Sequence, residues 1–157
     1  MDLILWRHAE AEDLLPGDGQ SCIDMDRSLT QRGEKQAARM AAWIDRQLPE
    51  GARIFVSPAR RCEQTALALG RRYKVRAELS PAATPAQLLE LVQWPTSKYP
   101  ILVIGHQPVL GQVIAQLLGL KEAECAVKKG ALWWLRTRDR DGHSQTVLVT
   151  VQSPELL

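Results

Sequence analysis

The chain has 157 residues, a length that favours one domain with a core that needs neither disulfides nor a structural metal. Hydrophobic residues make up 45% and charged residues 24%, and no apolar run reaches membrane-spanning length, so we expect a globular protein without a membrane partner. The net charge of +2 is small and the aromatic residues do not interleave with Lys and Arg, which argues against nucleic acid as a partner.

The start of the chain and its cysteines favour the cytoplasm. Asp2 precedes the first apolar run, Arg7 ends it after a few residues, and no small-residue cleavage site of a signal peptide follows. Cys22, Cys62 and Cys125 are odd in number, widely spaced and match no zinc or redox motif. We therefore predict a cytoplasmic protein with reduced, non-catalytic thiols.

The first predicted elements are a strand, a long loop and a helix. Residues 3–6 are apolar at every position, as in a strand that helices cover on both faces. Residues 13–28, rich in Gly, Asp and Ser, predict a loop that either borders a functional site or is mobile. Thr30 is placed to cap a helix whose apolar positions recur at helical spacing, and Pro49-Glu50-Gly51 ends it.

Two further strand and helix pairs are predicted in the middle of the chain. Residues 54–56 form a short buried strand, and Ser57-Pro58 opens a helix whose apolar stripe runs to Tyr73. Residues 75–79 predict a third strand, and Pro85 starts the next helix, which continues through Val92.

The last third of the chain predicts a strand, a helix and a hairpin. Residues 101–104 form a fully apolar strand, and the helix after it buries residues from Leu110 to Leu117. Residues 131–138 and 145–151 look like two strands joined around Asp141-Gly142, a good hairpin turn. The alternation predicts a single domain, 1–157, of the α/β class: a three-layer α/β/α structure with a mostly parallel mixed sheet and a C-terminal antiparallel hairpin.

Three segments share one design, in which polar residues follow an apolar strand. They are Arg7-His8, Ser57-Pro58-Ala59-Arg60-Arg61 and Gly105-His106-Gln107-Pro108. Parallel strands bring these clusters to one edge of the sheet. We also expect Pro58 and Pro108 at first helical positions, so that two helix N-termini aim free N–H groups at that edge. Arginines, histidines and helix N-termini together indicate recognition of a phosphoryl group, with one His free to attack it.

These residues carry a family resemblance. Arg7-His8, the run from Ser57 through Arg61 to Thr65-Ala66, and the late Gly105-His106 are similar to the histidine phosphatase superfamily. Within it, the chain resembles the small phosphohistidine phosphatases of the SixA type. The motifs behind this closer likeness are Asp26-Arg-Ser-Leu-Thr-Gln-Arg-Gly33, Glu78-Leu-Ser-Pro81 and His106-Gln-Pro108.

The resemblance implies a phosphoglycerate mutase-like fold, no cofactor and no metal, and a role for each matched residue. His8 would be the nucleophile and form a transient phosphohistidine. Arg7 and Arg61 would hold the phosphoryl oxygens, and His106 would donate a hydrogen bond to them. Gln107 is a further candidate phosphate-binding residue.

The resemblance leaves the proton donor for the leaving group open. Glu78 is the best-placed carboxylate for this general acid, and Glu10 and Glu12 are weaker candidates close to His8. A phosphohistidine protein as substrate would relax the need for such an acid, because the leaving imidazole protonates near neutral pH.

Three other functions are open at this point. A phosphatase of the same superfamily could act on a small phosphomonoester such as a sugar phosphate or a nucleotide. A regulatory module could bind phosphate without catalysis, although binding alone has no need of His8. A metal-dependent hydrolase could use His8 and His106, but Arg7 and Arg61 would repel the cation, and no carboxylate and histidine cluster has ligand spacing.

Overall fold

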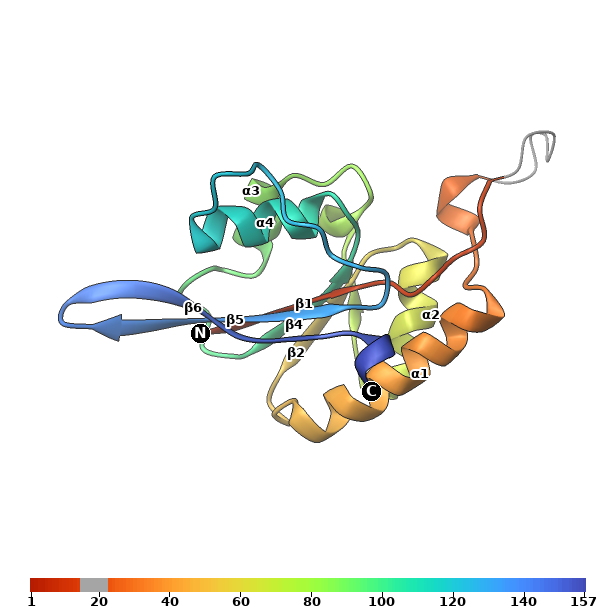
Figure 1. Cartoon of the computed structure of the whole chain (residues 1–157), viewed down its shortest axis with the longest axis horizontal. Coiled ribbons are helices and arrows are strands. Elements are labelled where there is room, and N and C mark those ends of the chain that lie inside the picture. Colours follow the sequence, from red (N-terminus) through yellow and green to blue (C-terminus); the bar gives the residue numbers. More distant parts are fainter. Residues whose placement is uncertain (15–22) are drawn as a thin grey trace.

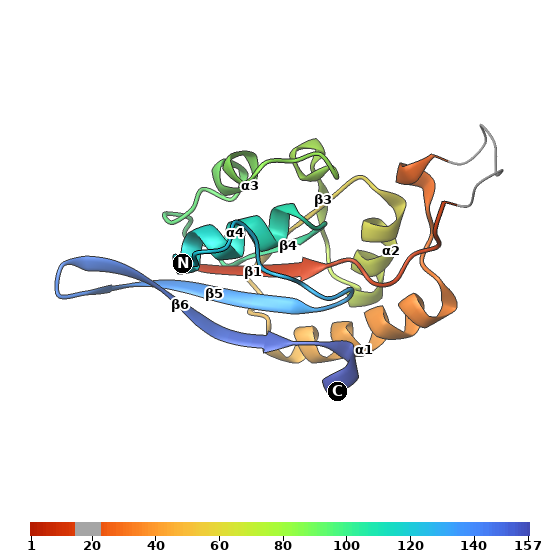
Figure 2. The same ribbon diagram turned by 45° about the horizontal axis from the view of Figure 1, so that its top comes forward.

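The computed structural model describes residues 1–14 and 23–157 of the chain, and it forms three layers with a sheet between two groups of helices (Figures 1 and 2). The six-stranded sheet has the order β3-β2-β4-β1-β5-β6. Its first four strands in this order run parallel, and β5 and β6 extend it as an antiparallel hairpin. The strands are β1 (Asp2–Arg7), β2 (Arg53–Val56), β3 (Lys74–Val75), β4 (Ile101–Gly105), β5 (Leu132–Arg140) and β6 (His143–Gln152). This arrangement confirms the predicted α/β class.

Helices on both faces explain why the central strands lack polar alternation. Helices α1 (Gln31–Gln47) and α2 (Arg60–Leu69) pack on one face, and α3 (Pro85–Leu91) and α4 (Val109–Leu118) pack on the other. Ile4 and Trp6 of β1 belong to the apolar cluster on the α1 and α2 side. Leu3 and Leu5 belong to the cluster on the α3 and α4 side. Successive side chains point to opposite faces of a strand, so both sets are buried.

Local signals place several ends of elements where the sequence predicts them. The Thr30 hydroxyl caps α1 by accepting the Gly33 N–H at 2.9 Å. Thr84 and Gln87 form a reciprocal capping box at the start of α3, with Pro85 as its first helical residue. The hairpin turns at Asp141 and Gly142, whose φ angles are 52° and 78°. Both angles lie in the left-handed region that such a turn requires.

Two predicted elements are wrong in extent. The strand predicted at 75–79 is limited to β3, and Ala77–Leu79 forms a 3₁₀ helix, η3. Val75, Ala77 and Leu79 imitate strand alternation, but only Leu79 is buried, because it turns into the core on the α3 side. Helix α2 ends at Leu69, where Gly70 takes a left-handed conformation that terminates it, so Tyr73 lies outside the helix.

The prolines expected at first helical positions lie before their helices. Helix α2 begins at Arg60 after its N-cap residue Ala59, so Pro58 precedes the helix. Pro108 is itself the N-cap residue of α4, and that helix begins at Val109. A few residues lie between each strand and its helix, with extended geometry at Ala59 and a turn at Pro108, and they shift both helix starts toward the C-terminus.

The predicted 13–28 loop is described only in part. Residues 15–22, which include Cys22, lie outside the described residues. Asp24–Asp26 forms a 3₁₀ helix, η2, so this part of the loop has structure of its own, and Ala11 and Leu29 form an isolated bridge. In the described part of the chain, no helix is long and apolar enough to cross a membrane.

Candidate active site

His8 leaves the carboxyl end of β1 with one ring nitrogen committed to the backbone. Its main-chain N–H donates to the Gly105 carbonyl of β4 at 3.1 Å, which joins the ends of the two strands. Its Nδ1 lies 2.8 Å from the Ala9 carbonyl oxygen. A carbonyl can only accept, so Nδ1 carries the proton of the neutral ring and Nε2 keeps its lone pair. The ring is therefore in the tautomer that a nucleophile attacking through Nε2 requires.

Burial keeps His8 uncharged. Its side chain is buried, and removal from water, assisted by the charges of His106, Arg61 and Arg7, lowers its pKa to about 3. The backbone bond to Ala9 opposes this shift without reversing it. His8 is consequently neutral throughout the physiological pH range.

Arg7 and Arg61 are each tethered to a backbone carbonyl, and each also has a buried donor without a partner among the described residues. Arg7 Nη1 donates to the Val127 carbonyl at 2.7 Å, and Arg61 Nη1 donates to the Asp24 carbonyl at 2.8 Å. Within the described chain, the Nε atoms of both guanidinium groups are buried and have no hydrogen-bond partner. A buried donor without an acceptor costs about 1–3 kcal/mol, more when it is charged. Burial, with the neighbouring Arg61, also lowers the pKa of Arg7, and an oxyanion would satisfy both donors.

His106 follows β4 and sits beside His8. The two ring centroids are 5.3 Å apart. Its Nδ1 lies 3.3 Å from Arg61 Nη2, which can only donate, so Nδ1 accepts and the Nε2 proton points to the Ser57 hydroxyl oxygen at 2.7 Å. Burial and then the charge of Arg61 lower the pKa of His106 to about 4. His106 is therefore a second neutral imidazole in this cluster.

A carboxylate that the sequence did not single out completes the cluster. Asp24 Oδ2 accepts from Arg61 Nη2 at 3.1 Å, and its Oδ1 accepts from Arg27 Nε at 3.0 Å. Partial burial opposes ionisation, but the two guanidinium groups outweigh it and lower the pKa of Asp24. Arg61 is thus anchored by an ionised, half-exposed carboxylate on η2.

Close backbone approaches at two glycines support these tethers. A Cβ on Gly111 of α4 would overlap the Cys125 carbonyl oxygen, and the Gly111 carbonyl accepts the Cys125 N–H at 3.0 Å. This contact holds the segment that carries Val127, the anchor of Arg7. On the other side, a Cβ on Gly33 would overlap the Glu10 carbonyl oxygen, so α1 packs directly against the segment after His8.

Two of the expected site residues have structural partners. The Gln107 amide donates to the Cys125 carbonyl at 2.9 Å and accepts the Gly111 N–H at 2.7 Å. Gln107 therefore caps α4, and the Gly111 N–H is not one of the free donors expected at this helix start. Glu78 on η3 accepts from Arg76 Nη2 at 2.7 Å, a bond that lowers the pKa of its carboxyl. An ionised Glu78 has no proton to give at neutral pH.

The other carboxylates near His8 also have local roles or none. The Glu10 carboxylate accepts from the Thr30 hydroxyl at 3.0 Å and pairs with Arg32 at 3.7 Å, and Glu12 is exposed. Buried Cys62 lies 3.5 Å from His106 Nε2, and desolvation raises the pKa of its thiol to about 12, so it is no nucleophile. Across the described residues, no group of three or more His, Cys, Asp and Glu side chains is arranged to hold a metal ion.

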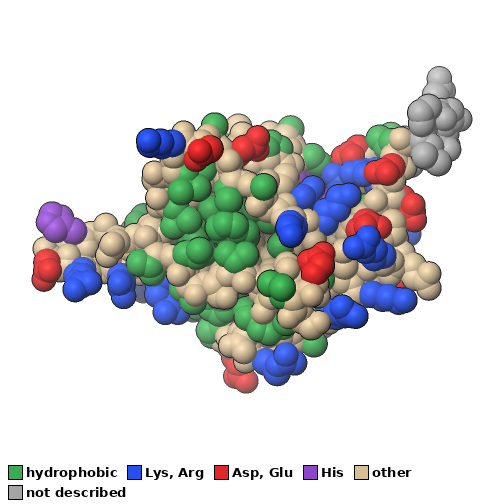
Figure 3. All heavy atoms as spheres, viewed as in Figure 1, with side chains coloured by type: hydrophobic (Ala, Val, Ile, Leu, Met, Phe, Trp, Pro, Cys, Tyr) green, Lys and Arg blue, Asp and Glu red, His purple; other side chains and the backbone are tan. Residues whose placement is uncertain are grey.

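The structure thus brings Arg7, His8, Arg61 and His106 together at the carboxyl edge of the parallel strands. In the space-filling view, Lys and Arg side chains gather on the part of the surface around α2 (Figure 3). Sequence reasoning missed the partners that hold the four site residues. Ser57-Pro58 predicts the start of a helix, but Ala59 is the N-cap residue of α2 and the Ser57 hydroxyl pairs with His106. The motif 26–33 overlaps η2 at Asp26 and so points to this segment of the chain. The Val127 side chain gives no indication that its backbone carbonyl accepts a hydrogen bond from Arg7.

Comparison with known proteins supports one superfamily. The model of the histidine phosphatase superfamily (branch 1) matches residues 3–85. The phosphohistidine phosphatase SixA of Escherichia coli is 30% identical over 125 residues, which cover 74% of each chain. A SixA homolog of Haemophilus influenzae is 26% identical over 98% of this chain and 97% of its own.

A solved structure agrees with these relatives. The structure of the protein histidine phosphatase SixA complexed with tungstate is 27% identical, covers 99% of both chains and superposes with a TM-score of 0.75. The family match spans the first two strand ends that carry Arg7, His8 and Arg61, and the relatives extend the likeness beyond them. Membership of this superfamily indicates a phosphatase activity. The chain belongs to the histidine phosphatase superfamily (branch 1).

Proposed function

We propose that this protein removes the phosphoryl group from a phosphohistidine residue of a phosphoprotein, through a covalent phospho-His8 intermediate. The observation that carries the proposal is the pairing of a neutral His8, whose Nε2 lone pair is free, with two buried Nε donors on Arg7 and Arg61 that lack partners among the described residues. A nucleophile next to donors for an oxyanion is the arrangement that phosphoryl transfer needs.

In the proposed first step, the His8 Nε2 lone pair forms a bond to phosphorus and the phosphorus–nitrogen bond of the substrate breaks. The ring departs as neutral imidazole, because its other nitrogen has taken up a proton from solvent before the bond breaks. In the second step, water attacks the phosphorus of phospho-His8, the bond to Nε2 breaks, and inorganic phosphate leaves. Arg7 and Arg61 stabilise the charge on the equatorial oxygens in both steps. The Ala9 carbonyl holds the Nδ1 proton of His8 throughout.

His106 is proposed to become a donor only when the phosphoryl group is bound. At rest its Nδ1 accepts from Arg61, and the arginine charge helps to keep its pKa low. A bound dianion beside the ring would raise that pKa and favour a proton on Nδ1. The bond from Nε2–H to Ser57 holds the ring in this orientation, so we assign Ser57 a positioning role.

The preference for phosphohistidine rests on the leaving group. Glu78 is ionised and paired with Arg76, which argues against a strong general acid at that position. An imidazole leaving group has an ordinary pKa near neutrality and needs no such acid, unlike the alkoxide of a sugar phosphate or a phosphoserine. The relatives named phosphohistidine phosphatase support the same substrate class, and tungstate in the complex of one of them is a tetrahedral oxyanion like a phosphoryl group.

The test is a trapping experiment with a protein labelled on histidine with radioactive phosphate. After an alkaline quench, the wild-type chain should carry a transient label and release inorganic phosphate. His8→Ala should do neither, whereas His143→Ala, which changes an exposed histidine at the hairpin turn, should behave as wild type. Phosphate release that persists in His8→Ala would contradict the mechanism.

Three measurements separate the remaining functions. Faster turnover of sugar phosphates or nucleotides than of the phosphohistidine protein would favour the small-molecule phosphatase. Binding of the labelled protein without any phosphate release would favour a regulatory module. Loss of activity in excess chelator would favour a metal-dependent hydrolase, whereas the proposed mechanism is insensitive to chelator.

A further inference from the structure

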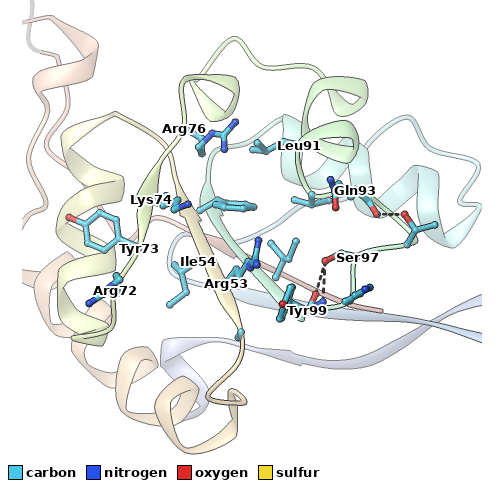
Figure 4. A pocket seen from close by; sticks show the side chains of 16 residues that line it. Arg53, Ile54, Arg72, Tyr73, Lys74, Arg76, Leu91, Gln93, Ser97 and Tyr99 are labelled. Carbon is cyan, nitrogen blue, oxygen red and sulfur yellow. Dashed lines mark hydrogen bonds between the residues drawn. The ribbon is translucent and has the colours of Figure 1, made fainter.

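A groove lies along the outer edge of the parallel sheet, away from the histidines. It is an open cavity of about 710 Å³ between the β2 and β3 strands and the segment 91–99 (Figure 4). The groove exists because β3 has only two residues, which pair with Phe55 and Val56. The first half of β2, Arg53 and Ile54, therefore has no paired strand on this side within the described chain.

The lining of the groove is strongly and uniformly basic. It holds five of the chain's 20 Lys and Arg residues and none of its 18 Asp and Glu residues. Only Arg76 has an ion pair, with Glu78 at 2.7 Å. The other lining cations make no ion pair with any carboxylate of the described residues, and all of them are exposed: Arg53, Arg72, Lys74 and Lys98.

Apolar and aromatic side chains form the floor and one wall of the groove. Phe55 and Ile101 on the floor are buried, whereas the Ile54 side chain packs on the opposite face of the sheet. The Arg53 guanidinium lies 4.0 Å from the centre of the Tyr99 ring, a cation–π contact that orders this arginine at the surface. The Ser97 hydroxyl bonds the Tyr99 N–H at 3.2 Å and carbonyl at 3.1 Å, which fixes the turn carrying the ring.

We propose that this groove binds an acidic, extended segment of a partner protein. Arg53, Lys74 and Arg76 lie between the strands and the 91–99 segment in Figure 4, and they come from different elements along the groove. Carboxylates spaced along a peptide can meet such a row, and the apolar floor can take side chains between them. A compact polyanion would instead need converging, buried donors like those of Arg7 and Arg61.

One end of the groove lies beside the strand that leads to the candidate active site. This Arg76 end is joined to β2, because the Arg76 N–H donates to the Val56 carbonyl at 2.8 Å, directly before Ser57. A segment bound here would run from the amino ends of β2 and β4 toward the catalytic edge. The inference is independent of the proposed catalytic function, since binding can be measured without turnover.

The experiment measures binding of a short fluorescein-labelled peptide of alternating Glu and Ser to the full chain by fluorescence anisotropy. We expect binding that weakens with salt, and a peptide of alternating Gln and Ser should not bind. Arg53→Glu with Lys74→Glu should weaken binding by about tenfold or more. Arg53→Gln with Lys74→Gln should weaken it less, and circular dichroism checks that each variant is folded.

The matched control is Arg138→Glu with Arg140→Glu, which makes the same charge change at exposed positions near the hairpin tip. This control should bind the acidic peptide like the wild type. Equal losses in both pairs would mean that only net charge matters and would overturn the groove as the site. Inorganic triphosphate that binds while the Glu and Ser peptide does not would overturn the proposed occupant in favour of a small polyanion.

Discussion

Two regions of this molecule gather positive charge, and they differ in how the cations are held. At the carboxyl edge of β1 and β2, Arg7 is partly buried and Arg61 is almost fully buried, and backbone carbonyls of Val127 and Asp24 tether them. In the groove beside β3, Arg53 and Lys74 are exposed and have no carboxylate partner among the described residues.

The difference shows that the same side-chain type serves two kinds of recognition. A tethered, buried guanidinium aims a donor at one point, which suits a phosphoryl group whose oxygens have a fixed geometry. An exposed cation on a flexible stem provides attraction without fixed geometry, which suits a segment of variable shape. The following variants test this contrast, beginning with the largest expected effect.

Removing a tethered arginine should affect catalysis most. Arg7→Ala or Arg61→Ala should lower kcat/KM for phosphate release from phosphohistidine protein by about 100- to 1000-fold, because each loses a preorganised donor to the developing charge. Arg7→Lys or Arg61→Lys should keep little of the wild-type kcat/KM, because an ammonium group lacks the planar arrangement of donors in a guanidinium group. Arg138→Ala, an exposed position on β5, is the control and should leave kcat/KM within about twofold. A small loss of kcat/KM in Arg61→Ala would refute the proposed role of Arg61 in holding the phosphoryl oxygens.

A substitution at Gly111, which supports the segment that tethers Arg7, should lower the stability of the fold. Gly111→Ala places a methyl group against the Cys125 carbonyl and should lower the free energy of unfolding by about 1–3 kcal/mol in urea denaturation. Because the same segment carries the Val127 carbonyl, kcat/KM should fall as well. Gly51→Ala, where an added methyl meets nothing within 4 Å, is the control and should change the free energy of unfolding by less than about 0.5 kcal/mol.

Acid should destabilise the fold through the two site histidines. Their folded-state pKa values of about 3 and about 4 lie below the ordinary 6.5, so the unfolded chain binds more protons between these limits. The stability that they contribute is complete above pH 6.5 and falls as the pH drops toward 4, by up to about 1.4 kcal/mol per pH unit for each imidazole.

The measurement is the free energy of unfolding from urea curves across this pH range. His8→Gln and His106→Gln should each make the pH dependence shallower, whereas His143→Gln, at an exposed position, should not. An unchanged slope in both site variants would mean that the two rings titrate normally and are not held neutral by burial.

The smallest effect concerns Asp24, the carboxylate paired with Arg61. Asp24→Asn removes a negative charge from beside Arg61 and keeps a similar side-chain shape. Inorganic phosphate should then inhibit about two- to fivefold more strongly, a modest change because Asp24 is half-exposed and screened by solvent. Asp26→Asn on the same short helix is the control and should leave the inhibition constant unchanged. Weaker inhibition in Asp24→Asn would show that the carboxylate chiefly positions Arg61.

Much of the fold could be predicted because its signals are local. Thr30 and the Thr84-Pro85 pair mark helix starts by their own side-chain chemistry, and the structure has helices there. The strand expected at 75–79 could not be corrected from the sequence, because its alternation is real and only tertiary packing shows that Leu79 alone is buried. The start of α2 differs from the prediction for a similar reason. The Ser57 hydroxyl accepts the Ala59 N–H and also pairs with His106, and the helix begins only at Arg60.

The sequence by itself determined which residues come together, because His8, Arg61 and His106 follow apolar strands that alternate with helices, and this pattern predicts the parallel pairing that the structure has. The tertiary structure decided what state they are in. The tethers of Arg7 and Arg61 depend on a carbonyl and a carboxylate far away in the chain. The Nδ1 proton of His8 is held by the neighbouring Ala9 carbonyl, but burial by distant segments keeps the ring neutral. The groove likewise depends on how short β3 is once folded. Hydrogen-bond partners and burial arise from packing between distant segments, so residue types alone cannot specify them.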